Sequence, residues 1–257
     1  MSDIIDTWNE GKVADVEGYY ENAKINRVYV DRVHVKKAFA EYTAAYNADD
    51  PKIKLKIDHT YRVAALCERI AKAAGMCAYD VELAWLSGML HDVGRFEQIK
   101  RYNTFSDADS VDHAKFGADL LFKDGLISTF LNGMVKCTGY KPGALEDRYS
   151  SDGVFLYDRL NKSDMEMLEL AIRCHNMYRI PQGLNSREQA FCNVLRDADK
   201  VDIFKVNIDT PLEEIYNTTT EELMKSDITD EVLEAFDEEH CILKAIRRTP
   251  ADTVIGH

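Results

Sequence analysis

The chain has 257 residues, of which 46% are hydrophobic, and this suits one large globular domain or a domain with appendages. Its 45 acidic residues outnumber its 32 basic ones, and the net charge of −13 argues against broad contact with nucleic acid or anionic lipid. The sequence shows no signal segment and no stretch of about 18 apolar residues, so we expect a cytoplasmic protein without a membrane segment. Its six cysteines include no C-x-x-C pair, and we expect them to be reduced thiols.

Apolar residues recur at helical spacing along most of the chain and predict an all-α fold. The first periodic segment covers 32–47 and ends at a turn before Pro51. The second covers 53–75, with His59 at the head of its apolar face and Gly75 as its stop. A histidine is therefore expected on the core side of this helix.

The third helical segment leads into a histidine and an aspartate. Its apolar stripe at positions i, i+3, i+4 and i+7 is formed by Val81, Ala84, Trp85 and Gly88. The stripe runs into His91 and Asp92, and we expect Gly94 to end the helix. The polar residues 97–112 that follow are expected to form a loop over a site.

Beyond this loop the periodicity resumes with another histidine. A helix is predicted to begin near His113, with Ser110 or Asp112 as its cap. A short helix over 125–137 and turns over 138–153 are expected to follow.

Two later helices also place a polar residue on an apolar stripe. His175 continues a stripe that begins at Leu168, and Pro181 breaks that helix soon afterwards. Over 187–204 an acidic residue, Asp199, stands where an apolar one is expected. A polar group buried in this way needs a partner or a cation.

The last part of the chain has the features of a structural segment. A capping box at Thr219 and Glu222 precedes a helix predicted near 229–243. The side chains expected to face inward from that helix are Val232, Leu233 and Phe236.

Five predicted stripes thus carry residues of the kind that bind metals. A lone buried histidine is usually hydrogen-bonded in a core, and a lone inward aspartate usually caps a helix or pairs with arginine. Together, four of the seven histidines and two aspartates favour one shared site: His59, His91, Asp92, His113, His175 and Asp199. The other three histidines, expected at the surface, are His34, His240 and His257. Imidazole and carboxylate ligands suit Mn, Fe, Co, Ni or Zn.

Three motifs resemble the HD superfamily of metal-dependent phosphohydrolases: His59-x-x-Arg-Val, Leu-His91-Asp92-Val-Gly-Arg and Ala-Asp199-Lys. The resemblance covers roughly residues 53–205. It implies an all-α HD-domain helical bundle in which the first metal is held by His59, His91, Asp92 and Asp199. In members with two additional histidines, the aspartate of this motif also bridges to a second metal. By this resemblance Asp92 would be that bridge here, and His113 and His175 would hold the second metal.

One branch of this superfamily, marked by a Gly-Tyr-Pro motif, cleaves cyclic dinucleotides, and the sequence departs from it. That branch has a second histidine where Cys174 stands, an acidic residue where Leu55 stands and a lysine where Arg95 stands. We therefore expect a two-metal site and a substrate other than a cyclic dinucleotide.

The resemblance also suggests how the chain is divided. We expect an HD domain over 53–205, an N-terminal helical extension over 1–52 packed on it, and a C-terminal helical extension of the same domain over 206–257. One short helix is expected within 1–27.

The ligand set and the resemblance predict a metal-dependent phosphohydrolase that cleaves a phosphoester of a small phosphorylated metabolite or nucleotide. Two divalent transition-metal ions, preferably Fe or Mn with Co, Ni, Zn or Mg as alternatives, would provide a bridging hydroxide and neutralise phosphoryl charge. The candidate catalytic residues are Asp92, Arg95 and Arg62, since an arginine fork fits phosphate oxygens, whereas Lys200 is interpreted as surface charge.

Two other functions fit the same ligands. Some members of the superfamily are mixed-valence di-iron oxygenases, and a non-catalytic metal-binding nucleotide sensor would also keep such a site. Hydrolysis is favoured because Arg95 and the basic residues Lys100 and Arg101 suit an anionic ligand. The expected partner is a small phosphorylated substrate rather than nucleic acid or a membrane, and nothing in the sequence indicates an oligomer.

Overall fold

In the residues that it describes, the computed structural model is built mainly of helices, which confirms the predicted all-α class. The residues that the structure describes are 26–27, 30–47, 49–131, 136–138, 155–156, 160, 162–209, 211, 213, 215, 218–239 and 241–256. The short helix expected within 1–27 and the turns expected over 138–153 lie mostly outside these residues, as do His240 and His257. Among the helices of the described ranges, none combines the length and the apolar character needed to cross a membrane.

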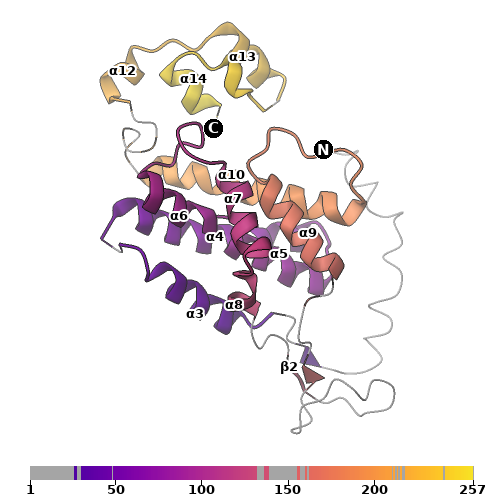
Figure 1. Cartoon of the computed structure of the whole chain (residues 1–257). Coiled ribbons are helices and arrows are strands. Elements are labelled where there is room, and N and C mark those ends of the chain that lie inside the picture. The colour runs from indigo at the N-terminus through magenta and orange to yellow at the C-terminus, as the bar shows by residue number, and fades with distance from the viewer. Residues whose placement is uncertain are drawn as a thin grey trace.

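Three helices form the centre of the molecule (Figure 1). Helix α4 (Pro51–Ala73) begins at Asp50, whose carboxylate accepts a backbone N–H of the first turn, and it has proline at its first position. It ends before Gly75, which has the left-handed φ of 72° expected of a helix stop. Helices α5 (Ala78–Leu90) and α10 (Ser186–Asp209) both pack on α4.

The close approach of α5 to α4 depends on Gly88. A Cβ atom at this position would lie 2.6 Å from Cα of Ala64, so a larger residue would push the helices apart. Val63, Cys67 and Leu86 are fully buried around this contact. The two helices that carry His59 and His91 are thereby held at a short, fixed separation.

A second close contact corrects the predicted role of Gly94. The prediction that Gly94 ends a helix was wrong: α5 ends at Leu90, and Gly94 lies in the first turn of a new helix, α6 (Val93–Tyr102). A Cβ atom at Gly94 would lie 2.4 Å from the carbonyl oxygen of His113, so the glycine serves close packing of α6 on the next helix. The expected loop over 97–112 is correspondingly shorter, because its first part is helical.

Helix α7 (His113–Ala118) packs against both α6 and α9 (Lys162–Cys174). Asp112 caps α7 by accepting the backbone N–H of Lys115, as one of the two predicted caps. A π-helical turn, η1 (Asp119–Lys123), continues α7.

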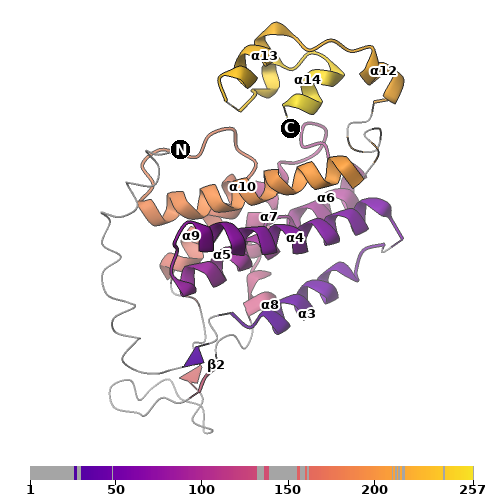
Figure 2. The ribbon, with the colours of Figure 1, turned by 180° about the vertical axis from the view of Figure 1, so that it is seen from behind.

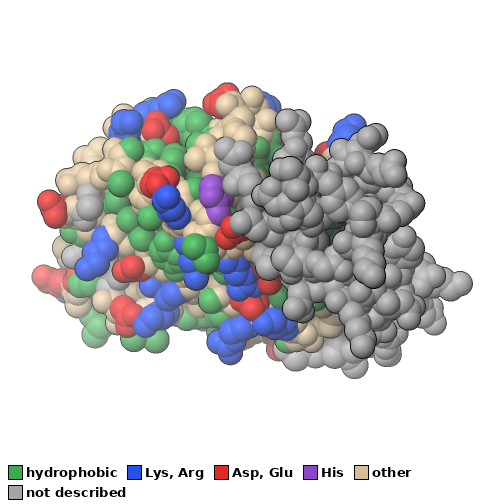
Figure 3. All heavy atoms as spheres, turned by 90° about the horizontal axis from the view of Figure 1, so that it is seen from below, with side chains coloured by type: hydrophobic (Ala, Val, Ile, Leu, Met, Phe, Trp, Pro, Cys, Tyr) green, Lys and Arg blue, Asp and Glu red, His purple; other side chains and the backbone are tan. Residues whose placement is uncertain are grey.

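The end of the molecule below α4 in Figure 1 carries short elements. Helix α3 (Arg32–Thr43) packs on α8 (Ile127–Leu131), which is shorter than the helix predicted over 125–137 because residues 136–138 form a strand. Three antiparallel strands pair in the order β1-β2-β3: β1 (Asn26–Arg27), β2 (Lys136–Thr138) and β3 (Phe155–Leu156). On the described part of this face, Lys and Arg side chains are interspersed with Asp and Glu among hydrophobic ones (Figure 3).

The C-terminal elements lie on the far side of α10 from α4 and α5 (Figure 2). They are α12 (Thr220–Met224), α13 (Asp230–Asp237), the 3₁₀ turn η3 (Lys244–Ile246) and α14 (Pro250–Ile255). The predicted capping box at Thr219 and Glu222 is present at α12. Of the side chains expected to face inward from α13, Val232 is buried, but Leu233 and Phe236 are 41% and 59% exposed, so the prediction was wrong for those two.

Candidate metal centre

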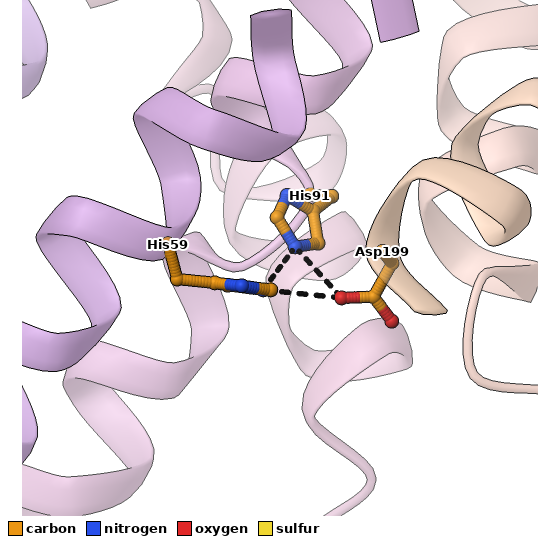
Figure 4. A group of neighbouring side chains, drawn as sticks. All are labelled: His59, His91 and Asp199. Atoms are coloured by element: carbon orange, nitrogen blue, oxygen red, sulfur yellow. Dashed lines mark hydrogen bonds and ion pairs between the residues drawn. The ribbon is translucent and has the colours of Figure 1, made fainter. Parts of the chain in front are cut away.

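Two histidines and an aspartate from three helices meet in the interior (Figure 4). His59 extends from α4, His91 follows the last residue of α5, and Asp199 extends from α10. His59 Nε2 lies 3.1 Å from Asp199 Oδ1 and 3.3 Å from His91 Nε2, and His91 Nε2 lies 3.6 Å from the same aspartate oxygen. These three atoms surround a position where one ion could bind.

Two further histidines form a second group beside the first. His113 at the start of α7 and His175 just after α9 bring their Nε2 atoms to 3.0 Å from each other. Both rings are buried, with 5% and 2% of each residue exposed. His91 and His175 also meet edge to face, with 5.1 Å between ring centroids, so the two groups are contiguous.

Asp92 lies between the two groups and directs one oxygen toward each. Its Oδ2 lies 3.6 Å from the Nε2 atoms of both His59 and His91. Its Oδ1 lies 3.6 Å from His113 Nε2 and 3.7 Å from His175 Nε2. The structure thus brings all six predicted ligand residues together around a carboxylate that could bridge two ions.

The Asp92 carboxylate is unusual for its place in the chain. Asp92 is the N-cap of α6, where an aspartate normally accepts a backbone N–H of the first turn, but its side chain makes no such bond. Oδ1 is buried and has no hydrogen-bond partner in the structure. A buried carboxylate oxygen without a donor is costly, so this atom requires a positive partner.

Each histidine in the centre bonds an acceptor through its Nδ1 atom. His59 Nδ1 faces Asp202 and His113 Nδ1 faces Asp107, both at 2.7 Å. The Nδ1 atoms of His91 and His175 face the carbonyl oxygens of Gly88 and Ile172, also at 2.7 Å, where only an N–H can be the donor. A proton on Nδ1 leaves Nε2 as a lone pair directed into the centre, which is the arrangement found in metal-binding histidines.

The electrostatics of the centre favour added positive charge. Burial opposes the ionisation of Asp92, but the Lys56 ammonium and the neighbouring histidines outweigh it and hold the pKa of the carboxyl well below its usual range. Burial also opposes charge on His91, yet the carboxylates of Asp92 and Asp199 raise its pKa. The pKa of His175 is lowered to about 3 by burial and by positive charge on the adjacent histidines. The Asp92 carboxylate is therefore ionised beside an uncharged His175 imidazole, and a carboxylate with a neutral imidazole is the combination that binds a metal ion.

The two predicted arginines lie near the centre in different situations. Arg95 extends beside Asp92, with its Nε 3.9 Å from Oδ1, while its Nη1 donates to Asp107 at 2.8 Å and to the carbonyl of Phe105 at 2.6 Å. Arg62 forms a two-pronged pair with Asp202 at 2.6 and 2.8 Å, so its fork is occupied by a carboxylate. Only Arg95 borders Asp92 directly.

Sequence reasoning missed three residues of this site: Lys56, Asp107 and Asp202. Lys56 Nζ donates to Asp92 Oδ2 at 2.8 Å, Asp202 accepts a hydrogen bond from His59 Nδ1, and Asp107 accepts one from His113 Nδ1. Lys56 and Asp202 each stand three residues from a predicted ligand, in the same helix, which places them on the same face. That spacing was the available signal for both, whereas Asp107 lies in a loop that carries no periodic signal.

The donors of this centre fit divalent transition-metal ions. Four imidazole nitrogens and the oxygens of two carboxylates are ligands that Mn, Fe, Co, Ni and Zn accept. Asp92, whose Oδ1 has no hydrogen-bond partner, forms with His91 and His175 a group that could hold an ion.

A family model for the HD domain matches residues 57–246. The chain belongs to the HD domain family. The HD domain is an all-α fold, in agreement with the helices described above, and the matched range contains every residue of the centre except Lys56. No curated protein and no solved structure matches the chain. The predicted division into 1–52, 53–205 and 206–257 stays a prediction.

Proposed function

We propose that this HD domain protein is a metal-dependent phosphohydrolase that acts on a small phosphorylated metabolite or nucleotide through two divalent ions, preferably Fe or Mn. The observation that carries the proposal is the position of Asp92, whose two oxygens face two separate histidine groups. His59, His91 and Asp199 would hold one ion with Asp92, and His113 and His175 the other. When bound, two such ions supply a nucleophile from water and neutralise charge on phosphoryl oxygens.

The remaining residues of the site support a phosphoryl substrate. Arg95 lies at the edge of the centre, 14% exposed, and its buried Nε atom has no hydrogen-bond partner in the structure. A guanidinium in this position can donate to an anionic oxygen that approaches Asp92. In the proposal Arg95 contacts the substrate. Arg62, which the sequence suggested for the same task, instead positions His59 through Asp202.

The decisive experiment compares wild-type protein with Asp92→Asn after purification with Mn²⁺ or Fe²⁺, using a panel of phosphomonoesters and nucleotides. The wild type is expected to release phosphate, and the variant should lose at least about 100-fold of that rate because a ligand shared by both ions is neutralised. Asp109→Asn changes an exposed carboxylate of the adjoining loop and serves as the matched control.

Three outcomes would contradict the proposal. Equal phosphate release by wild type and Asp92→Asn would show that the centre is not catalytic. An iron-loaded protein that consumes dioxygen on a polyol or a phosphonate, without hydrolysing phosphomonoesters in anaerobic buffer with Mn²⁺, would identify an oxygenase instead. Tight nucleotide binding with no turnover would identify a sensor.

A further inference from the structure

Lys56 places a positive charge directly on the carboxylate at the middle of the centre. Its Nζ lies 2.8 Å from Asp92 Oδ2, which is the oxygen that also faces His59 and His91. Lys56 extends from α4, one turn before His59. The ammonium therefore binds the same carboxylate oxygen that faces the candidate position of the first ion.

The Lys56 side chain reaches Asp92 from a partly exposed position. The Lys56 side chain is 15% exposed and that of Asp92 is 2% exposed. The ring of Phe105 lies beside it, with Lys56 Nζ 5.5 Å and Arg95 Cζ 5.8 Å from the ring centroid. One aromatic ring thus lies close to two cations, and both of these cations also lie beside Asp92.

The balance of charges gives Lys56 one role in the metal-free centre and another in the metal-loaded centre. Arg95 is paired with Asp107 and Arg62 with Asp202, so these pairs are close to neutral. Without metal, Lys56 then neutralises one of the two remaining carboxylates, those of Asp92 and Asp199. With two divalent ions bound, the same ammonium adds to an excess of positive charge, and its favourable partner becomes an anion.

We propose that Lys56 changes partner with the metal content of the centre: it neutralises Asp92 in the metal-free protein and binds a phosphoryl oxygen of the substrate in the loaded protein. This inference rests on the proposed function and deepens it. With Lys56 on the substrate, the loaded centre is selective for a phosphomonoester, which carries two negative charges near neutral pH, over a singly charged diester.

The test uses Lys56→Met and measures two affinities by isothermal titration calorimetry. Chelator-stripped Lys56→Met should bind Mn²⁺ at least about tenfold more tightly than the wild type, because a competing charge is gone. The Mn²⁺-loaded variant should bind inorganic phosphate about tenfold more weakly, because a ligand of the anion is gone. A residue that only supports the fold would weaken both affinities.

Two further variants keep the result interpretable. Lys54→Met removes an exposed lysine from the same helix and should change neither affinity. Lys56→Arg keeps the charge and should restore the wild-type affinity for Mn²⁺ to within about threefold, and thermal unfolding of every variant shows that it is folded.

The outcomes separate this inference from the function on which it rests. Wild-type protein that binds neither Mn²⁺ nor Fe²⁺ overturns both. Wild-type protein that binds Mn²⁺ and phosphate, with unchanged or weaker Mn²⁺ binding in Lys56→Met, overturns the role of Lys56 alone. Phosphate binding to the metal-free wild type that is as tight as binding to the loaded protein also overturns it.

Discussion

Replacing Asp202 by asparagine tests how the first histidine of the centre is held. Asp202 is 2% exposed, and all its observed partners are donors: Oδ2 lies 2.7 Å from His59 Nδ1, and the two oxygens lie 2.6 and 2.8 Å from Arg62 nitrogens. Asparagine has nearly the same size, but its amide group must direct an N–H toward one of these donors. The substitution therefore changes hydrogen bonding with little change in volume.

The expected consequence is a change in the protonation of His59. An amide N–H directed at His59 favours the ring form with its proton on Nε2, and that form cannot bind an ion through Nε2. Loss of such an orienting carboxylate lowers metal affinity about 10–100-fold, or about 1.4 to 2.7 kcal/mol. We expect Mn²⁺ binding to chelator-stripped Asp202→Asn to be weakened by this amount in a calorimetric titration.

Two comparisons decide whether this reasoning holds. Asp197→Asn changes an exposed carboxylate of the same helix and should leave the Mn²⁺ affinity unaltered. Arg62→Met should weaken Mn²⁺ binding in the same direction as Asp202→Asn, and at saturating Mn²⁺ it should leave the KM for substrate unchanged. A folded Asp202→Asn protein with wild-type Mn²⁺ affinity would refute the positioning role of Asp202. A raised KM in Arg62→Met would show that Arg62 contacts the substrate instead.

Two other predictions concern the packing and titration of the centre. Gly94→Ala should lower the free energy of unfolding by about 1–3 kcal/mol in urea denaturation, since its Cβ would lie 2.4 Å from the His113 carbonyl oxygen, and Gly117→Ala, at 3.0 Å from its nearest neighbour, should cost less. Equal stability of the two variants would contradict this account. Because the pKa of His175 is lowered to about 3 in the folded protein, the unfolded chain binds a proton at this residue below about pH 6.5 and the folded chain does not. The contribution of His175 to the free energy of unfolding of metal-free protein therefore falls by about 1.4 kcal/mol from pH 7.5 to pH 5.5. His175→Gln should remove that part of the pH dependence, and an unchanged slope would refute it.

The helical fold and the six central residues could be predicted because each lies on, or directly next to, an apolar stripe with a period of 3.6. Periodicity reports which face of a helix is buried, and a polar residue on that face stands out. Gly94 shows the limit of local signals, since a glycine after a helix is compatible with a stop or with close packing of a neighbour. Only the position of α7 distinguishes them. The partners of the histidines were missed for two reasons: Asp107, six residues before His113, lies in a loop without a periodic signal, and Asp202 bonds His59, which is distant in the chain.

The C-terminal helices illustrate the converse case. The spacing of Val232, Leu233 and Phe236 predicted one buried face on α13, and only Val232 is buried. An apolar stripe indicates a face that can be buried, but burial also requires an element on the other side. In the described part of the chain, α13 lies away from the central helices, so its stripe remains partly exposed (Figure 1).

The caps of the other helices show that the environment of Asp92 is specific to the centre. Asp31, Asp50 and Asp112 are also N-cap aspartates, and each accepts a backbone N–H of the helix that it begins. Such a bond stabilises a helix by about 0.5–2 kcal/mol. α6 lacks this contribution because the Asp92 carboxylate is turned toward four histidines, where one of its oxygens has no protein donor. Elsewhere the chain caps these helices with aspartate, and at α6 it gives up this stabilisation where the carboxylate faces imidazole nitrogens in a group that could hold a metal ion.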